Sequence, residues 1–207
     1  YYAYQMVVNN KVMNFLKNRG YQIINFNSGH HPTRKLTIAD TNVNCTHKNE
    51  FNSIFIQTTM YYFFEKYFKF MEDKRQHINC TFSEIAEYGK LPGPKFIFAH
   101  LVLPHNPYVF GPKGEPVFDD GVKTGEIIKR RYLDQLTFAN KKAKELIAQI
   151  LPPTPPFPII ILQSDHGPPS SFMPHNVHIQ ETMKILNAYY FPGQGKKLLY
   201  DSISPVN

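Results

Sequence analysis

PFPIIILQSDHGPP, residues 156–169, is the stretch that decides the fold class of this chain. Its four consecutive apolar residues, Ile159 to Leu162, predict a strand that is buried on both faces, as in the middle of a parallel sheet. Polar residues follow where this strand ends, and Gly167 with the two prolines after it turns the chain out of the sheet. Ligands bind at the carboxyl edge of open α/β sheets, so we expect a functional site here.

Asp165 and His166 are neighbours just beyond this strand. Carboxylate oxygen and imidazole nitrogen suit zinc or manganese, and with fewer imidazoles they suit magnesium or calcium. Adjacent residues of a regular strand point to opposite faces, so both side chains can reach one ion, or two adjacent ions, only where the strand breaks. We therefore predict that Asp165 and His166 are ligands of a divalent metal ion: Ca, Mn, Zn or Mg.

A second apolar run, residues 95–103, also reads as a strand and is followed by Pro104-His105-Asn106-Pro107-Tyr108. The prolines restrict the conformation of this loop and hold a histidine just past the strand end. We predict that His105 converges with Asp165 and His166 on one site.

The rest of the chain alternates between helical and strand patterns. We expect helices over residues 4–19, 53–71, 81–86 onward and 124–151, and strands over residues 21–26 and 185–190. Gly20 is expected to end the first helix, and Thr81 with Glu84 has the pattern of a capping box. The aromatic helix 53–71 is expected in the core, with a membrane or partner surface as the alternative. The predicted fold is α/β, with a largely parallel central sheet flanked by helices.

Four segments, in this order along the chain, resemble the sulfatase-like branch of the alkaline phosphatase superfamily. They are FAHLVLPHNPYVFGPKGEP (98–116), YLDQLTFANKKAKELI (132–147), PIIILQSDHG (158–167) and KILNAYYFPG (184–193). This branch includes arylsulfatases, lipoteichoic acid synthases and phosphoethanolamine transferases. The likeness runs from about Tyr21 to Pro192, and its most specific element is Asp-His-Gly after an apolar strand, preceded by Pro-His-x-Pro-aromatic.

The resemblance implies an alkaline phosphatase-like fold and a metal-dependent hydrolase or transferase that acts on sulfate or phosphate esters through a covalent intermediate. Asp165 and His166 match the family's metal ligands. His105 matches the catalytic histidine that holds the anionic group of the substrate, and His178 is a further candidate for substrate binding. The substrate would be an anionic ester, lipid or glycan linked. The parent protein would face the extracytoplasmic side of a membrane or the periplasm, and could be membrane-anchored.

The chain departs from the family in its nucleophile and its upstream metal carboxylates, for which we find no match. Cys45 is followed by Thr-His-Lys-Asn and Cys80 by Thr-Phe-Ser-Glu, so neither begins the Cys-x-Pro-x-Arg signature of sulfatases. We therefore expect residues 1–207 to be a single partial domain that lacks the amino-terminal, nucleophile-bearing portion and is inactive alone. The alternative is a non-catalytic sulfatase-like module that binds anionic glycan or lipid head groups.

Composition limits the remaining possibilities. The net charge of +7 favours an anionic partner, although scattered surface lysines explain the charge more simply. No nucleic-acid-binding motif accompanies the charge, so we expect no nucleic acid as a partner.

Cys45 and Cys80 could pair in an oxidising compartment or remain two buried thiols. In the loop 27–34, His30 and His31 could be ligands and Thr33 a nucleophile. Loop histidines without a carboxylate partner are more often simply exposed, which is the simpler interpretation of His30 and His31.

Overall fold

The computed structural model describes residues 6–45, 62–118, 125–168 and 178–200, except for the side chains of residues 62–69, 178 and 179. The chain forms two compact units, which we describe separately. The first comprises Tyr1–Gly121 and Arg131–Leu146, and the second comprises Val122–Arg130 and Ile147–Asn207. The architecture is mixed α/β, as the sequence predicts.

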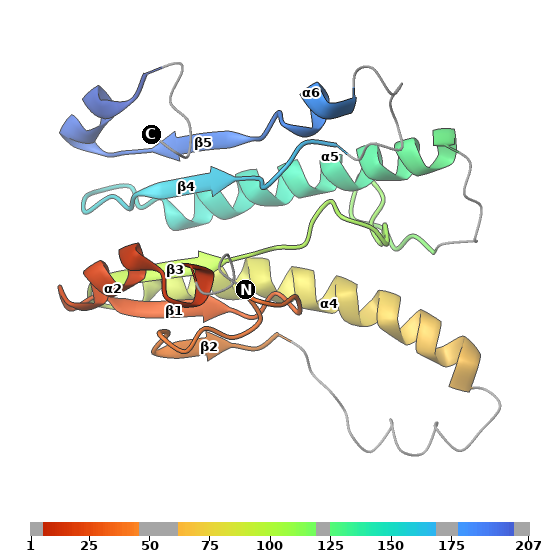
Figure 1. Ribbon diagram of the computed structural model, residues 1–207, viewed down its shortest axis with the longest axis horizontal. Coiled ribbons are helices and arrows are strands. Elements are labelled where there is room, and N and C mark those ends of the chain that lie inside the picture. The colour runs from red at the N-terminus through yellow and green to blue at the C-terminus, as the bar shows by residue number, and fades with distance from the viewer. Residues whose placement is uncertain (1–5, 46–61, 119–124, 169–177, 201–207) are drawn as a thin grey trace. The chain divides into compact units, whose positions relative to one another are not determined.

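The first unit contains a three-stranded parallel sheet with the order β2-β1-β3 (Figure 1). The strands are β1 (Gln22–Phe26), β2 (Thr41–Val43) and β3 (Lys95–Ala99). Ile24 of β1 lies opposite Thr41 on one side and Ile97 on the other. Because all three strands run the same way, the loops after β1, β2 and β3 leave the sheet at one edge.

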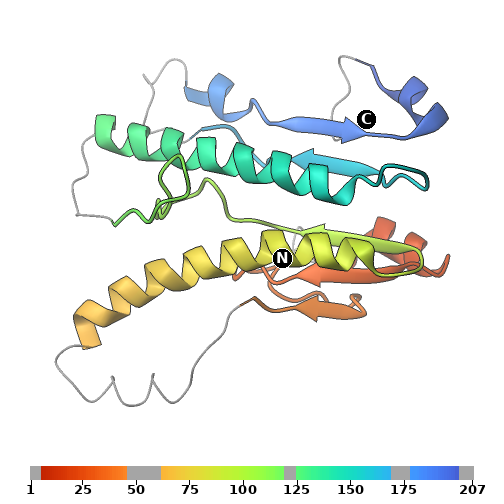
Figure 2. The same cartoon turned by 180° about the vertical axis from the view of Figure 1, so that it is seen from behind.

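Strand β1 is buried on both of its faces. Ile23 packs with Met13 of α2 (Lys11–Lys17), whereas Ile24 and Phe26 pack with Ile85 of α4 (Tyr62–Lys90). The two helices accordingly lie on opposite faces of the sheet, α2 in front in Figure 1 and α4 in front in Figure 2. The alternation of side chains along a strand produces this two-layer cover.

The predicted helix 4–19 is interrupted in the structure. Residues 6–8 are helical, and α2 begins anew after Asn10, whose Oδ1 accepts hydrogen bonds from the Val12 and Met13 amides at 2.9 and 3.1 Å. Helical spacing predicts one apolar face from Tyr4, Val8, Val12, Phe15 and Leu16. This prediction is wrong in part, because Val12 and Phe15 are exposed and Met13 is the buried residue of α2. Gly20 follows with φ +81°, a conformation that favours glycine and ends the helix as predicted.

Helix α4 runs for 29 residues without a break. The predicted capping box at Thr81 is wrong, since the Thr81 hydroxyl donates to the His77 carbonyl oxygen at 2.8 Å inside the helix. A hydroxyl that bonds four residues back is compatible with a helix interior. Residues 53–61 of the predicted helix 53–71 lie outside the described part of the chain.

Helix α5 (Gly125–Ile150) lies within one residue at each end of the predicted range 124–151. In the first unit its Phe138 stacks on Phe110 with 4.1 Å between ring centroids, and both belong to the largest core cluster among the described residues. That cluster comprises Met71, Ile78, Phe82, Val109, Phe110 and Phe138. The other fully buried residue of α5 is polar: Gln135.

The second unit contains a two-stranded sheet in which β4 (Ile160–Gln163) pairs with β5 (Asn187–Tyr190). It also contains α6 (His178–Thr182) and a 3-10 helix, η2 (Gly193–Leu198). The pairing is antiparallel, so the prediction that Ile159–Leu162 lies within a parallel sheet is wrong for the described strands. Burial on both faces is wrong as well, because Ile159 and Ile161 are 61% and 56% exposed. An antiparallel pair commonly leaves one face open.

Cys45, two residues after β2, forms a disulfide with Cys80 of α4. Of the two possibilities that the sequence leaves open, the structure has the pair rather than two thiols. None of the helices within the described ranges has the length and apolarity to cross a membrane.

Candidate functional site

Asp165 and His166 lie in the second unit, in the loop that follows β4. The strand ends at Gln163, so the break that the prediction requires precedes both residues. Both side chains face solvent, with exposed fractions of 81% for Asp165 and 51% for His166. They are therefore accessible to an ion or a substrate.

The hydrogen bond of the His166 ring determines its tautomer. Nδ1 lies 2.7 Å from the Gly167 carbonyl oxygen, and because a carbonyl can only accept, Nδ1 must carry the proton. In the neutral imidazole Nε2 then has the free lone pair. This atom lies 3.8 Å from Oδ2 of Asp165, while Oδ1 accepts from the His166 amide at 3.0 Å. Nδ1–H bonded to a carbonyl is the usual arrangement of a metal-binding histidine.

The distance between the two donor atoms fits a shared metal ion. Ligand nitrogen and oxygen lie about 2.0–2.2 Å from zinc, so two donors to one ion are at most about 4.4 Å apart. The Nε2–Oδ2 distance of 3.8 Å is within this limit. Within the described ranges, no group of three His, Cys, Asp or Glu residues could hold a metal. The pair thus fits a metal as two members of a larger donor set.

Gly167 explains how the loop is held in place. Its amide donates to the Thr182 carbonyl oxygen at 2.7 Å, which ties the loop to the end of α6. A Cβ on Gly167 would overlap the carbonyl oxygen of Glu181 and lie 2.7 Å from that of Lys184. Glycine is therefore required by the close approach of two backbone segments.

His105 belongs to the first unit, where the loop after β3 carries it at the surface. Its Nδ1 lies 2.6 Å from the carbonyl oxygen of Asn106 and must donate, so Nε2 has the lone pair here too. His30, in the loop after β1, has the same arrangement with the carbonyl oxygen of His31 at 3.0 Å. Three exposed histidines that follow strands therefore have their rings held through Nδ1.

Lys74 of α4 holds the His105 loop through two hydrogen bonds. Nζ donates to the carbonyl oxygens of His105 at 2.9 Å and Pro107 at 3.0 Å. Burial lowers the pKa of Lys74 from 10.5 to about 8, because the ammonium charge loses hydration by water. The backbone on both sides of Asn106 is thus fixed to α4.

Thr33 and His100 join the loops after β1 and β3. Thr33 Oγ1 lies 2.7 Å from Nδ1 of His100 and 2.8 Å from Oγ of Ser28. A hydroxyl beside an imidazole is the arrangement of an activated nucleophile. Thr33 is only 8% exposed, however, and its contacts equally fit a structural tie between the ends of neighbouring strands.

His77 of α4 hydrogen-bonds the backbone of Asn27, the first residue of the loop after β1. Burial lowers the pKa of His77, and this hydrogen bond opposes the shift. Sequence reasoning missed His77 and His100. Thr33 and His100 are 67 positions apart, and the only signal that connects them is that both follow strands of one parallel sheet.

His178 is the first residue of α6, and its side chain lies outside the described part of the chain. Asp165 and His166 are brought together in the second unit, and His105 lies in the first. Their convergence on one site stays a prediction.

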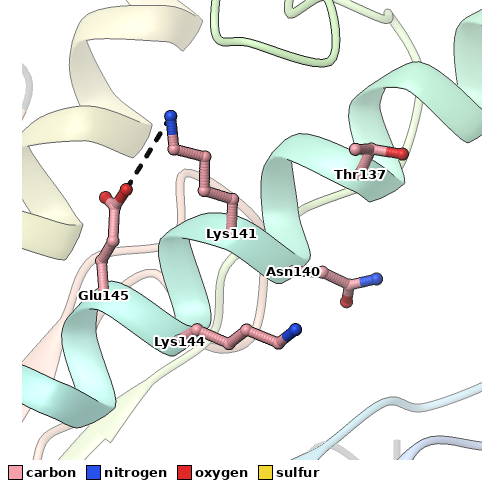
Figure 3. A pocket seen from close by; sticks show the side chains of 5 residues that line it. All are labelled: Thr137, Asn140, Lys141, Lys144 and Glu145. Atoms are coloured by element: carbon pink, nitrogen blue, oxygen red, sulfur yellow. Dashed lines mark ion pairs between the residues drawn. The ribbon is translucent and has the colours of Figure 1, made fainter.

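An open depression on the first unit is lined by one face of α5, as Figure 3 shows. Its residues are Thr137, Asn140, Lys141, Lys144 and Glu145. Lys141 and Glu145 form an ion pair at 3.9 Å across one helical turn. None of the predicted site residues lines this depression, and its charges are those of a solvated helix face.

Comparisons with protein-family models, with curated proteins and with solved structures find no match to this chain.

Proposed function

We propose that this chain is part of a metal-dependent hydrolase or transferase acting on sulfate or phosphate esters, with an alkaline phosphatase-like fold of the sulfatase-like type. The observation that carries the proposal is the exposed Asp165–His166 pair, whose Oδ2 and Nε2 are 3.8 Å apart just after a strand. The motifs resembling the family and the net charge of +7, which favours an anionic substrate, add support.

In this proposal Asp165 and His166 hold one divalent metal ion together with carboxylates from outside the described residues. When bound, such an ion neutralises ester oxygens and lowers the pKa of a hydroxyl nucleophile. His105 binds the non-bridging oxygens of the ester by donating from Nε2, which must carry a proton in the complex because Nδ1–H is already used on Asn106, and His178 contacts the substrate. The hydroxyl nucleophile is proposed to lie outside the 207 residues and to form the covalent intermediate.

The disulfide supports an extracytoplasmic location for this activity. Disulfides persist in oxidising compartments and are rare in reducing ones. Cys45 and Cys80 are paired, and they are the only two cysteines of the chain. An oxidising location agrees with the substrate class that the family resemblance implies, a lipid- or glycan-linked ester at the outer face of a membrane.

Manganese binding tests the metal proposal directly. Paramagnetic Mn²⁺ added to the 207-residue protein should broaden the amide signals of residues 164–167 first. Asp165→Asn and His166→Gln should each weaken this binding by at least about tenfold, the smallest effect expected even for an outer-shell change.

His30→Gln is the matched control, because His30 has the same Nδ1–carbonyl arrangement but no neighbouring carboxylate. This variant should bind Mn²⁺ like the wild type. Broadening that is centred elsewhere, or that survives in both site variants, would contradict the assignment of Asp165 and His166.

Turnover of aryl phosphate and aryl sulfate esters tests the position of the nucleophile. The 207-residue chain is expected to be inactive with or without Mn²⁺. Clear turnover that disappears in Asp165→Ala would contradict the absence of the nucleophile. Metal binding at the pair without activity in any longer form of the protein would instead favour the non-catalytic module that binds anionic head groups.

A further inference from the structure

Gln135 is a fully buried polar residue on α5, and it hydrogen-bonds to the backbone of Val109 and Phe110, which belong to an apolar core cluster of the first unit. A buried amide without partners would be costly, so its contacts need an explanation. All of them are made to one segment, residues 104–110, which is the loop that carries His105.

The side chain of Gln135 uses its full hydrogen-bonding capacity on this loop. Oε1 accepts from the amides of Val109 at 2.7 Å and Phe110 at 3.2 Å. Nε2 donates to the carbonyl oxygens of Pro104 at 3.0 Å and His105 at 3.1 Å. Two donors and two acceptors are all that a carboxamide offers, and the donor and acceptor ends cannot be exchanged here.

These four bonds bracket His105. Two of them reach the backbone at and just before the histidine, and the other two reach the strand-like segment that anchors the loop in the core. A carboxylate could not replace the amide, because it has no proton for the two carbonyl oxygens. An apolar side chain would leave the Val109 and Phe110 amides buried without a partner.

Lys74 provides an independent restraint from α4. Its Nζ also donates to the His105 carbonyl oxygen, so this oxygen accepts one hydrogen bond from α4 and one from α5. The imidazole itself is exposed and is held by Nδ1 on the Asn106 carbonyl oxygen at 2.6 Å. Thus a rigid backbone, held from two helices, carries a solvent-facing ring.

We propose that Gln135 is a positioning residue that fixes the His105 loop, so that His105 presents Nε2 in one orientation to an anionic ester. The role of His105 toward the ester rests on the function proposed above. The positioning of the ring does not, and it can be measured without substrate.

The test is the tautomer of each histidine, read from long-range ¹H–¹⁵N spectra of the folded 207-residue protein. In the wild type, His105, His30 and His166 should each show protonated Nδ1 and a free lone pair on Nε2. Gln135→Met keeps the length of the side chain and removes all four hydrogen bonds. His105 should then lose the single-tautomer signature, whereas His30 and His166 should keep it.

Gln149→Met makes the same chemical change at an exposed position of the same helix and should leave all three histidines unchanged. If Gln135→Met does not fold, Lys74→Met supplies the second test, because it removes two bonds to the same loop from the less buried side. An unaltered His105 tautomer in a folded Gln135→Met or, failing that, in Lys74→Met would overturn the inference.

Addition of inorganic sulfate separates this inference from the proposed function. Sulfate offers only acceptor oxygens, so its binding should favour a proton on Nε2 of His105. A sulfate-dependent shift of the His105 Nε2 signal that weakens in Gln135→Met is the expected result. If the tautomer changes as expected but sulfate shifts nothing in the wild type, the positioning role stands and the proposed function loses its substrate-binding histidine.

Discussion

Removal of the Cys45–Cys80 disulfide should lower the free energy of unfolding by about 4 kcal/mol. The bond joins residues 35 positions apart, from the end of β2 to α4. For a closed loop of that length, chain entropy gives about 12.7 cal/mol/K, or about 3.8 kcal/mol at 25 °C. Alanine is the suitable replacement, because Cys45 is only 3% exposed and burying a serine hydroxyl there without a hydrogen-bond partner would add a separate cost.

Urea unfolding of the double variant Cys45→Ala/Cys80→Ala and of the wild type gives the comparison. Far-UV circular dichroism and tyrosine fluorescence are suitable signals, since the chain has 13 tyrosines and no tryptophan. Wild type in reductant should match the double variant, and unreduced wild type should show no titratable thiol in urea. A loss below about 1 kcal/mol would refute the entropy argument, because it lies well under the typical range. Two reactive thiols in the unreduced protein would refute the pairing itself.

Three further changes test single contacts. Burial keeps the pKa of Lys74 near 8 in the folded state, against 10.5 when unfolded, so wild-type stability should gain from this group as pH rises between those values. Urea midpoints across that window should rise less in Lys74→Met. Thr33→Val removes the hydroxyl that contacts His100 and should lower the free energy of unfolding in urea by about 1–3 kcal/mol. An unchanged urea midpoint would show that the Thr33–His100 contact does not stabilise the fold. The hydrogen bond from Lys17 lowers the pKa of Asp40 below 3.8. The ionised Asp40 therefore stabilises the folded state, and this stabilisation is lost as pH falls through the lowered pKa. In acid unfolding, the stability of Asp40→Asn should not show this decrease at low pH.

Local patterns predict much of the fold. Strands β1 and β5 and helix α5 follow from runs of apolar residues with clear ends, and their predicted ranges are close to the observed ones. The errors arise where tertiary contacts decide between equivalent local patterns. Thr81 can cap a helix or bond back to its own helix, and the long continuous α4 selects the second.

Pairing of strands is harder to predict from sequence. Four apolar residues in a row fit a parallel or an antiparallel neighbour, and β4 pairs antiparallel with β5. Likewise, an apolar stripe places α5 against a core but does not show that Gln135 is its most buried residue. A glutamine between Asp134 and Leu136 carries no local signal of its four partners.

The predicted site shows the same division. Asp165 and His166 are adjacent in sequence, so the strand break alone brings their donor atoms within reach of each other. Thr33 and His100 meet only because β1 and β3 pair in parallel and in a particular register. Contacts of that kind depend on topology, which composition and spacing do not contain.

Gly167 has a consequence for any mutational survey of the loop it belongs to. The atoms that a methyl group would strike belong to the main chain, so no change of rotamer can relieve the collision. Even alanine must push the end of α6 away, and the two preceding side chains would be displaced with the loop. A saturation library scored for binding of the proposed metal ion should therefore find position 167 as intolerant as Asp165 and His166, although glycine has no side-chain atom to offer as a ligand.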